Sequence, residues 1–170
     1  MSTDAAIAPR NQHITDRGGI ARLANIWRVK GDRIVFTNGV FDLMHRGHVT
    51  YLEEAAALGD RLVIGLNSDA SVKRLGKGTD RPLNDQDSRA KVLAALRLVD
   101  AVVIFDQDTP LELIKTIGPD VLVKGGDWKP DAIVGAREVQ DWGGSVHSIA
   151  FAHQRSTTAL LEKVRATEPR

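Results

Sequence analysis

Short, almost uninterrupted apolar segments alternate with helix-like patterns along most of the chain. The apolar segments are rich in Val and Ile, which is typical of strands buried on both faces of a parallel sheet. They lie at 34–36, 62–66, 101–105, 121–123 and 146–151. Helical patterns follow them at about 47–58, 68–75, 85–98, 110–117, 131–140 and 157–166. The alternation predicts an α/β fold, a Rossmann-like doubly wound parallel sheet of five strands in a single domain.

Local sequence signals mark both ends of the predicted helix at 110–117. Thr109-Pro110-Leu111-Glu112 predicts a capping box with Pro at the first helical position, and Gly118-Pro119 predicts the end of that helix. Near the N-terminus, the spacing from Ile20 to Trp27 predicts a short amphipathic helix before Gly31. This helix could pack on its own domain or on a partner. We expect residues 1–30 to form a tail and a short helix, and 31–170 to form the main domain.

Composition narrows the functional classes. The chain has 170 residues, a net charge of +1 and no cysteine, which excludes disulfides, thiolate metal sites and Cys nucleophiles. The near-neutral charge predicts no nucleic-acid partner. The N-terminus has no secretory pattern, and no apolar run approaches the ~20 residues that span a bilayer. We therefore expect a cytoplasmic protein without a membrane partner.

The turn after the first predicted strand is the strongest candidate for chemistry. It leads from Thr37 through a glycine-bearing turn to His45 and His48 at the start of a helix. Spacing of i, i+3 places both imidazoles on one side of the first helical turn, and a helix N-terminus favours phosphate. Gly47 between them allows a ligand to approach the backbone. The alternatives are histidines that only cap the helix or lie on the surface, and a metal pair, which would need further ligands.

Other segments that follow strands or open helices can meet at the same edge of the sheet. Arg89 shares the core-facing side of its helix, which suggests either an anion contact or an internal salt bridge with an Asp. The run 124–127 follows a strand, so a base or ribose could pack on its glycines, although a tight turn explains them too. The run 155–158 offers three hydroxyls after Arg155, more than one helix cap requires. Asp42 could hold its turn or help to position a triphosphate.

The run TNGVFDLMHRGH, residues 37–48, resembles the HxGH signature of the nucleotidylyltransferase superfamily, which includes cytidylyltransferases and phosphopantetheine adenylyltransferase. Further segments recur in the same order: 67–69 (NSD), 81–82 (RP), Arg89, 123–128 (VKGGDW) and 156–158 (STT). Together they resemble the adenylyltransferases of ADP-heptose synthesis over about residues 33–166. In many bacteria this activity is fused behind a sugar kinase domain. A chain of 170 residues has no room for one, so it resembles the stand-alone form, with 31–170 expected as the nucleotidyltransferase domain.

This resemblance implies transfer of AMP from ATP to D-glycero-β-D-manno-heptose 1-phosphate for lipopolysaccharide core biosynthesis. Mg²⁺ is expected on the triphosphate, and a homodimer is the implied assembly. The implied catalytic residues are His45, His48 and Arg89. The implied nucleotide-binding residues are Thr37, Asn38, Gly39, Phe41, Gly47, Lys124, Gly126, Asp127, Arg155, Ser156, Thr157 and Thr158. The implied sugar-phosphate contacts are Asp42, Lys73 and Arg81.

Three other functions use some of the same residues. A cytidylyltransferase for glycerol 3-phosphate or a similar alcohol phosphate would have the same scaffold. A non-catalytic nucleotide sensor would retain the fold and the motif without turnover. A metal-dependent hydrolase would use the two histidines as ligands, and its activity would be lost to chelators and restored by Zn²⁺.

Overall fold

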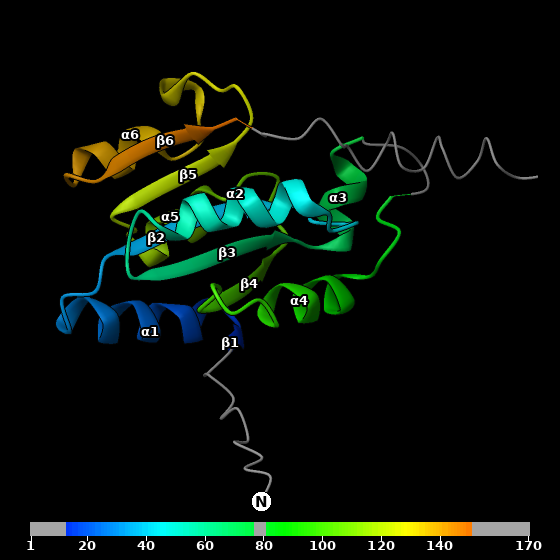
Figure 1. Cartoon of the computed structure of the whole chain (residues 1–170), viewed down its shortest axis with the longest axis horizontal. Helices are drawn as coiled ribbons and strands as arrows, with labels where there is room; N and C mark the ends of the chain where they lie inside the picture. The colour runs from blue at the N-terminus through cyan, green and yellow to red at the C-terminus, as the bar shows by residue number, and fades with distance from the viewer. Residues whose placement is uncertain (1–12, 77–80, 151–170) are drawn as a thin grey trace, which may run out of the picture.

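The computed structural model describes residues 13–76 and 81–150, and its core is one wholly parallel sheet. Six strands are hydrogen-bonded in the order β1-β4-β3-β2-β5-β6. They are β1 (His13–Thr15), β2 (Ile34–Gly39), β3 (Arg61–Asn67), β4 (Ala101–Phe105), β5 (Val121–Gly125) and β6 (Ser145–Ile149). The strand arrowheads in Figure 1 point to the side of the molecule where α3 lies. That side is the carboxyl end of the sheet.

The helices connect successive strands. They are α1 (Arg17–Val29), α2 (Arg46–Ala56), α3 (Asp69–Arg74), α4 (Gln86–Ala94), α5 (Leu111–Ile117), the 3₁₀ helix η1 (Pro130–Ala132) and α6 (Ala136–Asp141). Two hydrophobic clusters separate them into layers. One cluster packs α1, α5 and α6 on one face of the sheet, and the other packs α2 and α4 on the opposite face, with α2 in front of the sheet in Figure 1.

Alternation along each strand explains the two layers. In β2, Ile34 and Phe36 belong to the cluster under α1 and α5, whereas Val35 belongs to the cluster under α2. All three side chains are fully buried. Because successive side chains of a strand point to opposite faces, a strand covered on both faces must be apolar at every position. The uninterrupted apolar runs in the sequence have this cause.

The five predicted strands are all present, and the predicted count of five is corrected to six. The additional strand, β1, pairs in parallel with β4, and Ile14 lies opposite Val102. It has only three residues, two of them polar, so it lacks the apolar run that revealed the other strands. The doubly wound α/β architecture is confirmed. The predicted helix at 157–166 lies outside the described residues.

Two local predictions about helix ends are wrong. The helix α5 has Pro110 at its N-cap and no side-chain cap, so the capping box predicted from Thr109 and Glu112 does not form. The helix predicted at 131–140 is divided into η1 and α6, because Gly135 adopts a left-handed conformation with φ of 86°. By contrast, Gly118 ends α5 in a left-handed conformation as predicted.

The N-terminal helix packs on its own domain. Ile20, Ala24 and Trp27 of α1 are buried in the cluster that contains α5 and α6. Arg28 donates hydrogen bonds to the carbonyl oxygens of Ile117 (2.8 Å) and Gly118 (3.2 Å), at the end of α5. Strand β1 belongs to the same sheet, and helix α1 to the same hydrophobic core, as the rest of the described chain.

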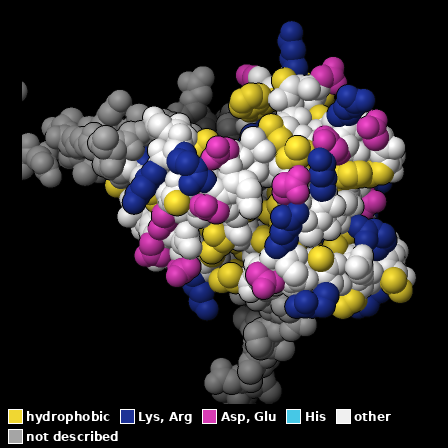
Figure 2. All heavy atoms as spheres, turned by 180° about the vertical axis from the view of Figure 1, so that it is seen from behind, with side chains coloured by type: hydrophobic (Ala, Val, Ile, Leu, Met, Phe, Trp, Pro, Cys, Tyr) yellow, Lys and Arg dark blue, Asp and Glu magenta, His cyan; other side chains and the backbone are white. Residues whose placement is uncertain are grey.

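The surface shows no bias towards one sign of charge on the face seen in Figure 2. Basic and acidic side chains alternate there with small apolar patches, and no histidine of the described residues shows on it. Within the part of the chain that the structure describes, none of the helices combines the length and apolar character needed to cross a bilayer.

The strand order locates a point where the chain reverses direction across the sheet. From β2 the chain proceeds to β3 and β4 on one side, and it then returns to β5 and β6 on the other. In open α/β sheets, ligands bind outside the carboxyl ends of the strands at such a topological switch point. The carboxyl ends of β2 and β5 therefore mark the candidate site.

Candidate functional site

The turn from β2 to α2 has an unusual backbone conformation. Phe41 has φ of 47°, the one positive φ among the described non-glycine residues. For a bulky residue this left-handed conformation costs about 1–2 kcal/mol. Its ring packs on Gly39, where an added Cβ would lie 2.9 Å from the ring, and it lies 5.6 Å from the His48 ring between centroids. Glycine at 39 is thus required by the position of Phe41.

The two histidines of the motif cap helix α2. The Nδ1 atom of His45, the N-cap residue, accepts a hydrogen bond from the Gly47 backbone N–H at 3.1 Å. The Nδ1 atom of His48 accepts from the His45 backbone N–H at 3.4 Å, which completes a reciprocal capping box. The two ring centroids are 4.0 Å apart. The prediction that both imidazoles lie together at the first turn is confirmed, and so is the capping role that the sequence left open.

Capping also fixes which nitrogen of each ring carries hydrogen. An imidazole whose Nδ1 accepts a hydrogen bond carries its hydrogen on Nε2. Burial, with a smaller contribution from the charge of His45, lowers the pKa of His48 to about 4. His48 is therefore a neutral Nε2–H donor at neutral pH. Capping and donation to a ligand use different atoms of the same ring, so one role does not exclude the other.

Helix α2 is fixed to the sheet directly below the switch point. The Tyr51 hydroxyl hydrogen-bonds the Thr37 hydroxyl of β2 and donates to the Val123 carbonyl of β5 at 3.4 Å. Burial raises the pKa of Tyr51 to about 12, so this hydroxyl remains a donor. The side chain of Thr37 is fully buried under α2. The backbone of Thr37 is buried as well, so the contact with a nucleotide that the sequence predicts stays a prediction.

Lys124 and Asn38 meet at the switch point. They are the next-to-last residues of the neighbouring strands β5 and β2, and the Lys124 ammonium donates to the Asn38 Oδ1 at 3.3 Å. A cation and a carboxamide thus lie at the carboxyl edge of the two central strands. This is the location that the sequence predicts for two nucleotide-binding residues.

The loop after β5 turns back on itself. Gly126 has φ of 110°, and its N–H donates to the Ile149 carbonyl of β6 at 2.8 Å. The Trp128 indole N–H donates to the Gly125 carbonyl at 3.2 Å, and 49% of the Trp128 surface is exposed. Asp127 is exposed. The tight turn considered from the sequence is present, and it leaves one face of the indole and the Asp127 carboxylate at the surface.

Asp42 holds a second loop against the motif. Its carboxylate accepts from the backbone N–H groups of Leu83 (2.9 Å) and Asn84 (2.9 Å) and from the Arg81 guanidinium (2.9 Å). The Asn84 side chain donates to the Asp42 carbonyl at 2.8 Å. Burial acts to raise the pKa of Asp42, but the hydrogen bonds and Arg81 outweigh it and lower the pKa. Of the two roles considered for Asp42, the described structure has the one that holds the turn.

Arg89 is buried beneath this turn. Its side chain has no exposed surface and forms an ion pair with Asp69 at 2.6 Å. It also donates to the carbonyl oxygens of Val40 (2.7 Å) and Asn84 (3.0 Å). The internal salt bridge with an Asp, one of the two roles that the sequence allowed, is therefore present. A contact between Arg89 and a triphosphate stays a prediction.

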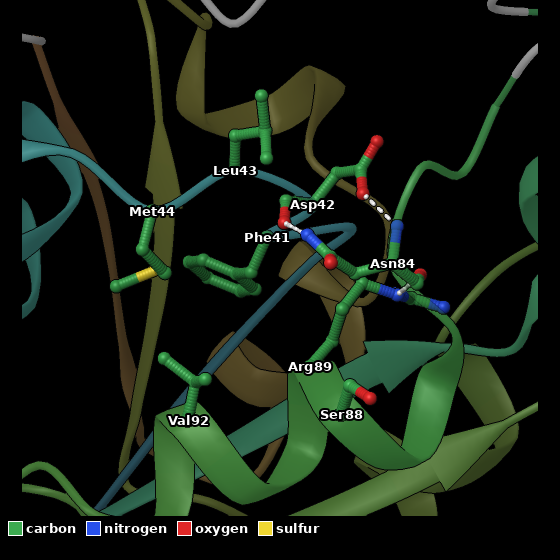
Figure 3. Close-up of a pocket in the computed structure, with 8 residues that line it drawn as sticks. All are labelled: Phe41, Asp42, Leu43, Met44, Asn84, Ser88, Arg89 and Val92. Carbon is green, nitrogen blue, oxygen red and sulfur yellow. Dashed lines mark hydrogen bonds between the residues drawn. The ribbon is translucent and has the colours of Figure 1, made fainter.

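A pocket of about 170 Å³ opens between the turn and α4 (Figure 3). One wall comes from the turn and the other from α4 and the loop before it. Most of the exposed wall is apolar, with the Asn84 carboxamide and the Arg89 guanidinium at one end. The pocket is lined by Phe41, Asp42, Leu43, Met44, Asn84, Ser88, Arg89 and Val92.

The remaining predicted site residues differ in where they lie. Lys73 is exposed on α3, and Arg81 is paired with Asp42. Arg155, Ser156, Thr157 and Thr158 lie outside the described residues. Within 13–76 and 81–150, no group of three or more His, Asp or Glu side chains is arranged to hold a metal ion.

Sequence reasoning missed three residues of the site. Tyr51 is the single tyrosine of the chain and follows His48 by three positions on the same helix, which is a signal that could have been used. Asp69 was noticed only as part of a recurring segment, although it is the partner of Arg89. Asn84 has no signal in the sequence, because its contacts with Asp42 span 42 positions.

Fold and site together define an α/β protein of the doubly wound type with a histidine-bearing turn at its switch point. The family model described as cytidylyltransferase-like matches residues 36–170. The chain belongs to this family.

Named relatives agree with this assignment. The chain is 58% identical over 132 residues to D-beta-D-heptose 1-phosphate adenylyltransferase of Bordetella bronchiseptica, covering 78% of this chain and 82% of that protein. It is 55% identical over 140 residues to bifunctional protein HldE of Magnetococcus marinus, covering 82% of this chain and 28% of that protein. The chain therefore spans less than a third of this bifunctional relative.

A solved structure extends the comparison to three dimensions. The lipopolysaccharide core biosynthesis protein from Thermoplasma volcanium is 27% identical to this chain, with a TM-score of 0.59. The match covers 74% of this chain and the whole of that protein. The similarity thus includes the fold.

Proposed function

We propose that the protein is an adenylyltransferase that transfers AMP from ATP to D-glycero-β-D-manno-heptose 1-phosphate and releases pyrophosphate, for lipopolysaccharide core biosynthesis. The observation that carries the proposal is the pair of histidines at the switch point, with both Nδ1 atoms occupied by backbone N–H groups. The relative from Bordetella bronchiseptica, matched over 82% of its length, supports the choice of donor and acceptor through its name.

The proposed reaction is an in-line displacement at phosphorus. An oxygen of the sugar 1-phosphate attacks the α-phosphorus of ATP, a new P–O bond forms, and the bond to the β-phosphate oxygen breaks. Pyrophosphate leaves with the electron pair of that bond. Such a reaction needs little covalent participation from the protein, so positioning and charge stabilisation supply the rate acceleration.

The side chains at the switch point suit these tasks. The Nε2–H groups of His45 and His48 would donate to the α- or β-phosphate oxygens as negative charge develops. Lys124, held by Asn38, would neutralise part of the triphosphate charge. The backbone of Gly126 and the exposed carboxylate of Asp127 would contact the nucleoside. Arg155, Ser156, Thr157 and Thr158 would hold the leaving pyrophosphate, as the family resemblance implies.

Mg²⁺ belongs to the triphosphate in this proposal. When bound there it would neutralise charge on the leaving pyrophosphate. Asp42 is a poor ligand for it because Leu83, Asn84 and Arg81 already occupy its carboxylate. We therefore assign Mg²⁺ to phosphate oxygens rather than to a protein cage.

The decisive experiment measures pyrophosphate release with four substrate pairs. ATP and CTP are each combined with heptose 1-phosphate and with glycerol 3-phosphate. We expect release with ATP and heptose 1-phosphate to exceed the other three combinations. Preference for CTP and glycerol 3-phosphate would identify a cytidylyltransferase instead, and release in none of the four would leave a nucleotide sensor.

The same proposal places the protein in the cytoplasm, where ATP is available, and assigns it a homodimeric assembly from the family resemblance. Light scattering after size-exclusion chromatography tests the assembly. A mass near the 18.5 kDa of one chain would contradict the dimer.

A further inference from the structure

We propose that Arg89, paired with Asp69, is a positioning residue for the histidine motif: it holds the Val40 carbonyl and thereby keeps Phe41 in its left-handed conformation against the His48 ring. The kinetic part of this inference rests on the proposed function, whereas the structural part does not. It assigns Arg89 a task other than contact with the triphosphate.

The contacts of Arg89 join three segments. Its Nη1 donates to the Val40 carbonyl in the motif turn, its Nε donates to the Asn84 carbonyl in the loop before α4, and its Nη2 meets Asp69 at the start of α3. A guanidinium is a rigid planar fork of donors, so it fixes the relative positions of the groups that it bridges. The Arg89 side chain is fully buried, so its N–H groups are shielded from water, whereas 32% of the Asp69 side chain is exposed.

The residue next to Val40 is the strained one. Phe41 has a positive φ, a conformation that persists for a bulky side chain only when the surroundings determine it. The Arg89 hydrogen bond fixes the carbonyl of the peptide unit that leads into Phe41. On the other side of Phe41, the Asp42 carboxylate is bound to the loop at 81–84. Phe41 is thus held in place through the contacts of its two neighbours, Val40 and Asp42.

The position of Phe41 matters to His48. The two ring centroids are 5.6 Å apart, and the rings are inclined by 56°. Phe41 is 6% exposed, so its ring forms part of the apolar surroundings of the imidazole. Those surroundings lower the pKa of His48 and keep the imidazole neutral. Movement of the Phe41 ring would therefore alter both the position and the protonation of His48.

Arg89→Met tests the proposal, because Met replaces the apolar stem of Arg and has no donor. The readouts are the titration of the His48 ring by NMR in the free protein, and kcat and KM for ATP in the pyrophosphate assay. We expect the His48 pKa to rise from about 4 towards 6.5. We also expect kcat to fall by about 10²-fold, as for a misplaced reacting group, with KM for ATP little changed. Arg89→Lys should return both the His48 pKa and kcat part of the way to their wild-type values.

Two results would overturn the proposal. If Arg89→Met raises KM for ATP and leaves the His48 titration unchanged, Arg89 contacts the triphosphate directly. If the variant only lowers the melting temperature, with unchanged titration and kcat, Arg89 serves stability alone. The NMR readout needs no turnover, so wild-type protein that fails to release pyrophosphate would contradict the proposed function without affecting this test.

A second variant covers the case in which Arg89→Met does not fold. Phe41→Gly retains Arg89 and its partners, accepts the positive φ, and removes the ring. It should shift the His48 titration in the same direction, and an unchanged titration would contradict the proposal. Arg74→Met is the matched control, because Arg74 forms exposed ion pairs with Asp106 and Asp108. It should leave the His48 titration and kcat unchanged.

Discussion

The two ends of the sheet use charged groups in different ways. At the amino end, three carboxylates accept backbone N–H groups at 2.8 Å: Asp60 from Arg33, Asp100 from Leu62, and Asp120 from Ile34. Arg61 bridges Asp32 and Asp100 and lies over the Trp27 ring. These charged groups at the amino end are thus paired with one another or with the backbone.

The carboxyl end presents a different set of groups. There the buried guanidinium of Arg89, paired with the partly exposed Asp69, supports the histidine turn, and the two imidazoles and Lys124 lie at the edge of the central strands. The contrast indicates that the amino end supplies stability, whereas in the proposed function the carboxyl end supplies chemistry at some cost in strain, notably at Phe41.

The largest effect should come from the histidines. His48→Ala should lower kcat by about 10²–10³-fold, the usual loss for one donor to a developing negative charge, with little change in KM for ATP. His45→Ser should also lower kcat, although Ser is a good N-cap and should preserve the start of α2. Steady-state kinetics and circular dichroism test both variants. An unchanged kcat in His48→Ala would refute the assignment.

A substitution at the amino end should lower stability and leave kcat unchanged. Asp100→Ala removes the acceptor of the Leu62 N–H and one partner of Arg61. It should lower the free energy of unfolding by about 1–3 kcal/mol and leave kcat of the folded protein unchanged. Urea denaturation measures the free energy of unfolding, and the pyrophosphate assay measures kcat. Loss of kcat at unchanged stability would remove the distinction between the two ends.

Gly39→Ala tests the steric side of the carboxyl end. Its Cβ would lie 2.9 Å from the Phe41 ring and must displace it, which should destabilise the protein by about 1–3 kcal/mol and lower kcat. Gly18→Ala is the matched control, because the added Cβ in α1 meets its nearest atom at 3.6 Å. It should leave kcat unchanged. Equal behaviour of the two variants in thermal unfolding and kinetics would contradict a special role for Gly39.

The last effect concerns pH. The pKa of His48 is about 4 in the folded protein, against 6.5 as its ordinary value. Between these values the unfolded chain binds the proton first, so stability is complete above about 6.5 and declines as the pH falls towards 4. Thermal unfolding of wild type and His48→Gln over this range should show a steeper decline in wild type. Parallel curves would show that His48 is not protected from protonation.

Sequence alone specified much of this molecule. The alternation of apolar runs and helical patterns predicted five of the six strands, because a strand buried on both faces needs apolar residues throughout. It also placed both histidines at one helix start, since their spacing of three residues determines that geometry. Lys124 and Asn38 could be placed at one edge because each follows a predicted apolar segment of a parallel strand.

The remaining features depend on contacts that no local pattern encodes. The ion pair of Arg89 and Asp69 spans 20 positions, and the contact of Lys124 with Asn38 spans 86. The sequence allowed Arg89 either an anion or an internal carboxylate, and only the packing of α3 against α4 identifies the carboxylate in the folded chain. Strand β1 was missed because three residues with two polar side chains give no periodicity.

That short strand has a consequence for how the protein behaves at high concentration. Strand β4 is the apolar sequence AVVIF, and β1 covers its outer edge through residues 13–15. An apolar strand with an open edge is a template for pairing with other chains, and a very short edge strand with polar side chains is a poor one. Three residues at the margin of the sheet thus cover positions 101–103 of an apolar strand that would otherwise be open to pairing with neighbouring molecules.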